Sequence, residues 1–276
     1  MKKKIAIVFL TFNSEKTLLK SLINATKISK EIFIVDSYSN DKTIDICKKF
    51  KCKIFKRKFE NYSNQRNWII NKLNRKYFWQ LHIDADEILD TQCINAINKI
   101  IINEKLKEKV FLIRRKYYFL GKKIKYSGLN EWHLRLFQSF SVKCENRLYD
   151  QHFITKFKLS KILSGFIHEN DRLNLNQWKK KHIKWAEFEA KEVLKKSNKI
   201  NRFNKLSDPR HSTRKSKTFF YKMPLFLRSF FYFIYRYFFK LGFLDGKNGI
   251  LFCFYHALWY RLLIDYKIYI NKKKIN

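Results

Sequence analysis

The chain has 276 residues, of which 46% are hydrophobic and 17% aromatic, and its 60 lysines and arginines against 23 aspartates and glutamates give a formal charge of +37. This length and hydrophobic content support one large domain, or one domain with an appendage, and exclude a largely disordered chain. The presence of only 6 glycines and 2 prolines excludes collagen-like, linker-rich and turn-dense all-β architectures, so regular helices and strands must dominate.

The first half alternates short apolar runs with amphipathic stretches, which predicts a Rossmann-like β-α-β sheet with helices on its faces. The apolar runs are mostly β-branched or aromatic, as strands require. The predicted strands cover residues 5–10, 32–36, 53–55, 78–83 and 110–114. The predicted helices begin at Ser14, at Asn40 or Asp41, at Ser63 and at Thr91, and they end at residues 25, 50, 73 and 102.

The second half has a less regular pattern. Beyond residue 115, Gly121, Gly128 and Gly165 mark turns between short strands. Apolar residues at helical spacing predict a helix over residues 175–199, and the polar stretch 197–216 is predicted to be a loop. An aromatic segment follows from residue 219.

The cysteines and the N-terminus indicate a cytoplasmic location. The five cysteines are scattered and include no Cys-x-x-Cys pair, so we expect reduced thiols. The apolar run at residues 5–10 follows three lysines in the manner of a signal peptide, but it is too short, and Thr11, Asn13 and Glu15 interrupt it.

The positive charge is concentrated in the second half. Residues 1–110 carry 23 basic and 12 acidic side chains, whereas residues 111–276 carry 37 and 11. Lysine, asparagine, isoleucine, phenylalanine and tyrosine are all abundant, which is typical of an AT-rich genome, so codon usage explains part of the charge. Nucleic-acid binding through counterion release is an alternative, but the aromatic residues form one apolar cluster instead of alternating with cations along a groove.

The segment 219–243 interleaves four basic residues with many phenylalanines, tyrosines and leucines. Its longest uncharged stretch, residues 229–235, is far shorter than the roughly 20 apolar residues that cross a bilayer. We therefore predict helices that lie on the surface of an anionic membrane, with basic residues on one side and aromatic rings on the other. The alternatives are a pair of aromatic helices buried in the core and a membrane-spanning segment.

Polar residues follow three of the predicted strands, at residues 11–15, 36–41 and 84–87. Ligands of open α/β sheets bind at the carboxyl ends of the strands, so we expect these segments to meet at one edge. Asp84 and Asp86 flank a small residue directly after a strand. Two carboxylates placed in this way suit magnesium or manganese bridged to substrate phosphates, although a solvated turn or a helix cap is the alternative.

Five motifs identify a family resemblance. They cover residues 7–13, 34–43, 64–67, 81–87 and 134–137, and weaker similarity continues at residues 181–182, 186–190 and 241–247. In this order they resemble the motifs of family 2 glycosyltransferases, and within them the lipopolysaccharide-core glucosyltransferase-like branch. The resemblance implies an α/β fold of the GT-A type, which is a Rossmann-like mixed sheet flanked by helices. It also implies inverting sugar transfer from a nucleotide-sugar, typically a UDP-sugar.

The resemblance also assigns a donor site. Asp36 would accept a hydrogen bond from the base, Ser39 and Asp41 would shape the following turn, and Asp86 would bind the divalent metal, magnesium or manganese. The other implied donor-binding residues are Thr11, Asn13, Glu15, Arg66, Asn67 and Asp84. Helix capping is the alternative for Asp36 and Asp41, and a surface position is the alternative for Arg66.

Sugar transfer also requires a base for the acceptor hydroxyl. By resemblance we predict Asp150 as this base, with Glu131, Glu145 and Glu169 as rivals, and we predict that Glu131, Trp132 and His152 lie on the acceptor side. His168 is predicted to be a further metal ligand or a diphosphate contact, with a purely structural histidine as the alternative.

These inferences combine into one predicted organisation. Residues 1–115 would form the nucleotide-sugar-binding half of the GT-A domain, residues 116–200 its acceptor-side half, and residues 201–276 a basic, aromatic helical region that attaches to the membrane. The predicted protein is a peripheral enzyme of the inner membrane face that acts on a lipid-linked or lipopolysaccharide-type acceptor. Sugar transfer to polyprenyl phosphate is an alternative, and an inactive relative that serves as an assembly partner is another.

Overall fold

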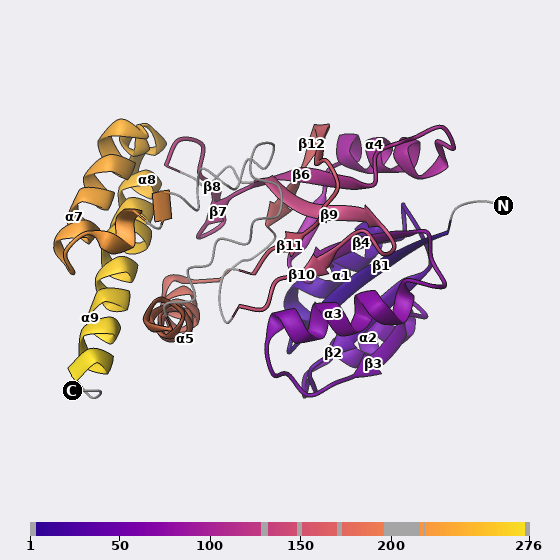
Figure 1. Ribbon diagram of the computed structural model, residues 1–276, viewed down its shortest axis with the longest axis horizontal. Coiled ribbons are helices and arrows are strands. Elements are labelled where there is room, and N and C mark those ends of the chain that lie inside the picture. The colour runs from indigo at the N-terminus through magenta and orange to yellow at the C-terminus, as the bar shows by residue number, and fades with distance from the viewer. Residues whose placement is uncertain are drawn as a thin grey trace.

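The computed structural model describes residues 4–127, 132–147, 151–169, 173–195, 216–217 and 219–273. Figure 1 shows two lobes. One contains the sheet and the helices α1 to α4, and the other contains the C-terminal helices α7 to α9. Helix α5 lies beside α9, on the side of the helical lobe that faces the sheet (Figure 1).

The larger lobe is built on an eight-stranded mixed sheet in the order β3-β2-β1-β4-β9-β6-β12-β5. Strands β1 to β4 are parallel, β9 is antiparallel to its neighbours β4 and β6, and β12 is parallel to β6. Strands β1 to β4 cover Ile5–Thr11, Ile32–Asp36, Lys53–Lys56 and Trp79–Asp84. Strands β5, β6, β9 and β12 cover Glu87–Leu89, Val110–Lys116, Trp132–Gln138 and Ser160–Glu169. Because strands from both sides of residue 115 share this sheet, the two predicted halves form one layer.

Two short hairpins and the helices complete the described chain. Strand β7 (Tyr118–Phe119) pairs with β8 (Lys122–Lys123). Strand β10 (Lys143–Cys144) pairs with β11 (Phe153–Ile154). The helices α1 to α5 cover Glu15–Ala25, Thr43–Lys49, Tyr62–Leu73, Thr91–Ile102 and Leu175–Leu194. The C-terminal helical segments are α7 (Leu227–Ile234), η1 (Tyr235–Phe239), η2 (Gly242–Asp245), α8 (Gly246–Phe252), η3 (Cys253–Trp259) and α9 (Tyr260–Lys273).

The core lies on both faces of the central strands. Successive residues of a strand point to opposite faces. Ile7 and Phe9 of β1 therefore pack with α1, α2 and α4, while Ala6 and Val8 pack with α3 on the other face. Burial on both faces explains why these strands read as continuous apolar runs. The arrangement is the GT-A fold that the sequence predicts, and it fixes the carboxyl ends of β1, β2 and β4 at one edge.

The helix starts differ in detail from the predictions. Asn61, and not Ser63, caps α3 by accepting a hydrogen bond from a main-chain amide of the first turn. Ser63 is buried, and its hydroxyl donates to the carbonyl of Glu145. Asp90, one residue before Thr91, caps α4 in the same way as Asn61 caps α3. Most of the predicted loop 197–216 lies outside the described residues.

Helix α5 is anchored to α9. Ala186 and Ala190 are small enough to let α9 approach, and they pack against Tyr260 and neighbouring apolar residues. Between the helices, the buried carboxylate of Glu189 accepts hydrogen bonds from Tyr260 and Tyr221 and forms ion pairs with Lys217 and Arg261. This fixes the helix that faces the sheet.

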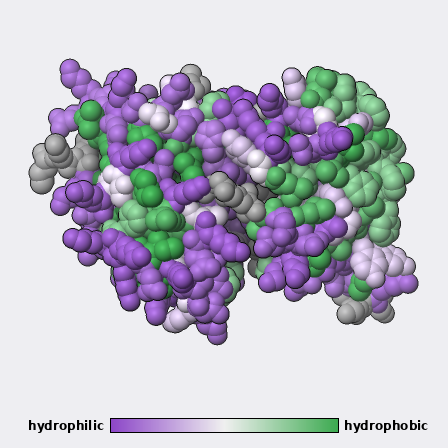
Figure 2. Space-filling view, turned by 180° about the vertical axis from the view of Figure 1, so that it is seen from behind, coloured by the Kyte–Doolittle hydropathy of each residue, from purple (hydrophilic) through white to green (hydrophobic). Residues whose placement is uncertain are grey.

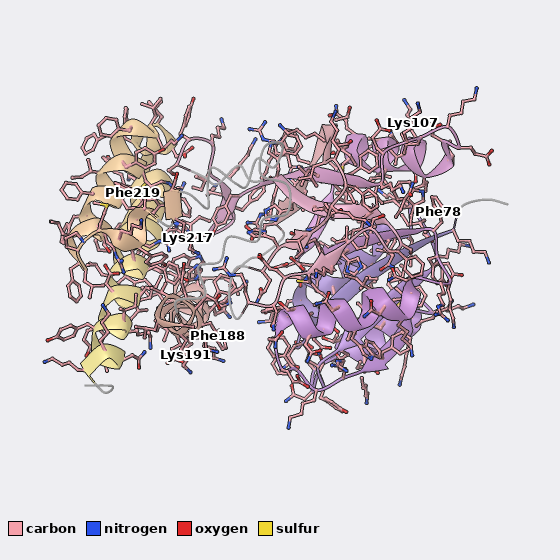
Figure 3. All side chains as sticks on the ribbon, in the orientation of Figure 1. Phe78, Lys107, Phe188, Lys191, Lys217 and Phe219 are labelled. Carbon is pink, nitrogen blue, oxygen red and sulfur yellow. The ribbon has the colours of Figure 1, made fainter. Side chains whose placement is uncertain are left out.

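The C-terminal lobe exposes many large apolar side chains. Figure 2 shows apolar residues gathered over this lobe, and Figure 3 shows aromatic rings that project outward from its helices. Among the most exposed are Phe219, Phe238 and Phe239. Within the part of the chain that the structure describes, no helix has the length and apolar character needed to cross a bilayer.

Candidate active site

The carboxyl ends of β1, β2 and β4 border a cavity of about 1260 Å³. Its opposite wall is formed by α5. The predicted site residues of the described chain that line it are Thr11, Asn13, Glu15, Asp41, Arg66, Asp84, Asp86, His152 and Glu169. The convergence of the three polar segments at one edge therefore places carboxylates, hydroxyls and cations around a single space.

Asp36 holds the loops together. Its carboxylate is wholly buried and accepts hydrogen bonds from the Thr11 hydroxyl (2.9 Å) and from the amide (2.9 Å) and hydroxyl (2.5 Å) of Ser39. The amide of Asn13 donates to the Ser39 hydroxyl oxygen, and the Asn13 side chain accepts from the amide of Asn40. Asp36 and Ser39 thus shape the cavity edge from behind its surface, without lining it.

A second pair of carboxylates joins the same two loops. The amide of Glu15 donates to Asp41, and the amide of Lys42 donates to Glu15. Asp41 also accepts from the amide of Thr43, the first residue of α2, although Lys42 and not Asp41 is the N-cap residue of that helix. Burial raises the pKa of Asp41, but hydrogen bonds from Thr43 and from the Glu15 amide outweigh burial and lower the pKa.

Asp84 lies between two arginines. Its two carboxylate oxygens are each 2.7 Å from a guanidinium nitrogen, one of Arg66 and one of Arg135. Arg135 also reaches Glu87 at 2.6 Å, and Glu87 accepts a hydrogen bond from the amide of Asp84. Arg66 is thus a cavity residue and not a surface cation.

This network sets the charge of the site. Burial alone would raise the pKa of Asp84, but Arg135 and Arg66 outweigh it and hold the pKa well below the usual range. Burial raises the pKa of Glu87 despite the opposing effect of Arg135. The two arginines therefore keep Asp84 ionised and fixed in position.

Asp86 offers a carboxylate to the cavity. Its side chain is 28% exposed, and one oxygen is 3.9 Å from the Lys181 ammonium of α5. Magnesium in such sites is typically held by one or two carboxylates together with substrate phosphates and water. Asp86 fits that role, because its carboxylate lines the cavity. In the described ranges, no group of three His, Cys, Asp or Glu side chains is placed to hold a metal ion.

The contacts that place His168 are with residues other than Asp86, and its role as a metal ligand or a diphosphate contact stays a prediction. Its ring nitrogens are 2.8 Å from the Tyr118 hydroxyl and 3.4 Å from the Asp90 carboxylate, and it does not line the cavity. The reason is the two-residue period of β12, which points Glu169 into the cavity and its neighbour away. The structural alternative for this histidine is the one that the geometry supports.

Glu169 is one of the predicted rivals of Asp150 for the role of base. It lines the cavity and is 3.6 Å from Arg115. Burial raises its pKa to about 7, with Arg115 opposing the shift and Asp86 adding to it. A carboxyl group with such a pKa can exchange a proton near neutral pH.

The remaining predicted residues have mixed positions. Asn67 braces β10 through two hydrogen bonds with the backbone of Cys144 and does not line the cavity. Trp132, on β9, also lies outside the cavity lining, whereas His152 is part of it. Asp150 and Glu131 lie outside the described residues.

None of the predicted site residues lies on α5, the helix that forms one wall of the cavity. Gln177, Lys181, Trp185 and Phe188 line the cavity from this helix. The last three are spaced four and three residues apart, so the helical period already places them on one face. Phe188 is labelled on α5 in Figure 3.

The mixed sheet thus carries an Asp-x-Asp turn at the carboxyl edge of its parallel strands, and two arginines hold Asp84 of that turn. The model of glycosyl transferase family 2 matches residues 6–157, which is more than half of the chain. The chain belongs to this family.

Two relatives match this chain over most of its length. An uncharacterized glycosyltransferase of Rickettsia typhi is 24% identical over 266 residues, which cover 91% of this chain and 84% of the relative. One of Rickettsia prowazekii is 22% identical over 265 residues, with the same two coverages.

Solved structures of similar fold are more distant. S. aureus TarS, in complex with UDP-GlcNAc, is 12% identical with a TM-score of 0.46 and covers 98% of this chain and 92% of its own. Glucosyl-3-phosphoglycerate synthase from Mycobacterium tuberculosis, in complex with Mn²⁺, UDP and glucosyl-3-phosphoglycerate, is 13% identical with a TM-score of 0.31, over 42% of this chain and 44% of its own.

Proposed function

We propose that this glycosyltransferase transfers a sugar, with inversion, from a UDP-sugar to a lipid-linked or lipopolysaccharide-type acceptor at a membrane surface. The observation that carries the proposal is the position of Asp84 and Asp86. Both lie in one cavity at the carboxyl edge of the sheet, with Asp84 fixed by Arg66 and Arg135.

The donor end of the cavity suits a nucleotide-sugar. The loops after β1 and β2 form one rigid edge through Asp36 and Ser39, and Thr11, Asn13 and Glu15 face the cavity beside them. Asp86 would hold magnesium or manganese against the diphosphate, and the metal would stabilise the leaving group. Asp84, fixed by its arginines, would accept hydrogen bonds from sugar or ribose hydroxyls.

Inversion needs one base. The acceptor hydroxyl attacks the anomeric carbon, the bond from that carbon to the diphosphate oxygen breaks, UDP leaves, and the base takes the hydroxyl proton. We propose Asp150 for this step on the family resemblance, and Glu169 is its rival because it faces the cavity with a pKa raised to about 7 by burial.

The acceptor class is supported by the C-terminal lobe. Soluble proteins rarely expose a large contiguous apolar patch, and such a patch commonly marks an interaction surface. Phe238 and Phe239 are 56% and 75% exposed, and Lys240 follows them directly. Exposed aromatic rings together with nearby lysines suit the headgroup region of an anionic bilayer. A lipid-anchored acceptor would lie in that same plane.

The experiment is transfer from radiolabelled UDP-sugars to bacterial membranes, with wild type and Asp86→Asn. We expect label in the membrane fraction with at least one UDP-sugar, and a loss of at least 100-fold in the variant. Failure of every UDP-sugar to transfer, while another nucleotide-sugar does, would contradict the UDP assignment.

The exposed aromatic face also favours a second candidate, transfer to polyprenyl phosphate itself. Extraction of the labelled product into organic solvent, followed by mild acid, separates the two candidates. A product that is extracted whole and releases its sugar in mild acid is a polyprenyl phosphate sugar. A product that stays with the polysaccharide or lipopolysaccharide fraction supports the first candidate.

A further inference from the structure

We propose that Lys181 of α5 binds the diphosphate of the nucleotide-sugar donor, so that this helix completes the donor site. Lys181 lies beyond residues 6–157, the segment that the family model matches. The inference rests on the proposed function in one respect, which is that the donor is a nucleoside diphosphate sugar.

Lys181 lies close to Asp86. Asp86 projects from the turn after β4 and Lys181 from α5, and both line the same cavity from opposite walls. The distance of 3.9 Å between Nζ and the Asp86 carboxylate exceeds that of a direct hydrogen bond. The Lys181 side chain is 37% exposed, so its ammonium group is accessible from the cavity. A phosphate bound next to Asp86 therefore lies within reach of Lys181.

The lining of the cavity is rich in carboxylates. The cavity is lined by the carboxylates of Glu15, Asp41, Asp84, Asp86, Glu87 and Glu169, so a diphosphate can enter only if cations offset its charge. The guanidinium groups of Arg66 and Arg135 make ion pairs of 2.6 to 2.7 Å with Asp84 and Glu87.

Compared with these two arginines, Lys181 has a longer ion pair and a more exposed side chain. Lysine is also a common phosphate-binding residue, because its ammonium is a compact point charge on a flexible stem.

Packing on helix α5 holds Lys181 in position. His182, the next residue, is buried, and its ring is stacked on Trp178 with a centroid separation of 3.5 Å. One turn further along, the Lys181 ammonium lies 5.0 Å from the ring centroid of Trp185. Glu189 ties the same helix to the C-terminal lobe. The helix therefore presents Lys181 in a fixed place, and contacts with the donor would be transmitted to the lobe that carries the exposed aromatic face.

Calorimetric binding of UDP and of uridine, both with manganese, tests the proposal. The variants are Lys181→Met, Lys181→Gln and Lys181→Arg, and Lys180→Met is the matched control because Lys180 is exposed on the same helix. We expect Lys181→Met and Lys181→Gln to weaken UDP binding by roughly 10- to 100-fold, which is the range for a hydrogen bond to a charged group. Uridine binding should not change, Lys181→Arg should retain part of the affinity, and Lys180→Met should bind as wild type does.

The outcomes separate the inference from the function on which it rests. If wild type binds UDP and both neutral variants bind it equally well, Lys181 serves only as an ion-pair partner of Asp86 and the inference is wrong. Equal losses for UDP and uridine would also overturn it, because they would indicate a general disturbance of the site. If wild type binds no nucleoside diphosphate, the proposed function fails and the inference fails with it.

Discussion

Arg135 joins Asp84 to Glu87 through a single guanidinium nitrogen, at 2.7 Å from one carboxylate and 2.6 Å from the other. The three residues come from β4, β5 and β9, so this ion cluster fixes the Asp-x-Asp turn to β9, the neighbour of β4, and to the start of β5. The geometry of the candidate donor site therefore depends on a residue that need not touch the donor.

Arg135→Met should destabilise the protein by about 3–5 kcal/mol, because it removes the cation from the buried Glu87 carboxylate and one of the two arginine partners of Asp84. Chemical denaturation at pH 7 measures this loss. Arg75→Met is the control, since Arg75 is exposed on the same lobe and its replacement should change stability by less than about 0.5 kcal/mol. Equal effects of the two substitutions would show that the cluster contributes no stability.

The stability of the folded protein should depend on pH through the buried carboxylate of Glu189. Burial opposes its ionisation, but Lys217 and Arg261 outweigh burial and lower its pKa to about 2. Its unfolded pKa is about 4.3, so the folded state holds the proton less tightly and the ionised group stabilises the fold above that pH. This contribution, about 3 kcal/mol, should be lost as pH falls from about 4.3 to about 2.

The measurement compares wild type with Glu189→Gln by denaturation at several pH values. The stability difference should be largest near neutral pH and should shrink below pH 4. A difference that stays constant between pH 7 and pH 3 would contradict the assigned charge of Glu189.

The exposed aromatic face predicts membrane binding. Replacing both Phe238 and Phe239 by serine should weaken binding to phosphatidylglycerol-containing vesicles by at least roughly 10-fold, since each buried phenylalanine contributes about 1.5–3 kcal/mol. Phe140→Ser is the matched control, because Phe140 is 69% exposed and lies in the sheet lobe. Co-sedimentation measures the effect, and equal binding by all three proteins would refute the membrane surface.

Two glycines give a test of packing in β12. Gly165 has a φ of +81°, and a Cβ there would lie 2.2 Å from both the Asp90 carboxylate and the Cys93 amide. Gly121 has a similar φ of +76° but open space around it. Gly165→Ala should therefore cost several kcal/mol and Gly121→Ala only about 1 kcal/mol, as melting curves can show. Similar losses would mean that backbone strain alone matters.

The sequence was informative where neighbours along the chain decide the structure. The five predicted strands of the first half are all present, and their ends differ from the predictions by at most two residues, because each is a short apolar run bounded by turn residues. The convergence of the three polar segments at one edge follows from the parallel order of β1, β2 and β4, and it is also observed.

Contacts between distant segments could not be derived in this way. The two-residue period places His168 and Glu169 on opposite faces of β12, but it does not tell which face borders the cavity. The pairing of Asp84 with Arg135 joins strands 51 residues apart, and no local pattern indicates it. The same holds for Lys181, whose helix position was predictable and whose approach to Asp86 was not.

The most direct test of the central claim is calorimetric binding of UDP, with and without manganese, to wild type and to Asp86→Ala. The account predicts binding that requires manganese and is lost in the variant, while the thermal stability of the two proteins stays similar. Binding of equal strength in Asp86→Ala, or no binding of any nucleoside diphosphate to wild type, would contradict a donor site at the Asp84 and Asp86 turn.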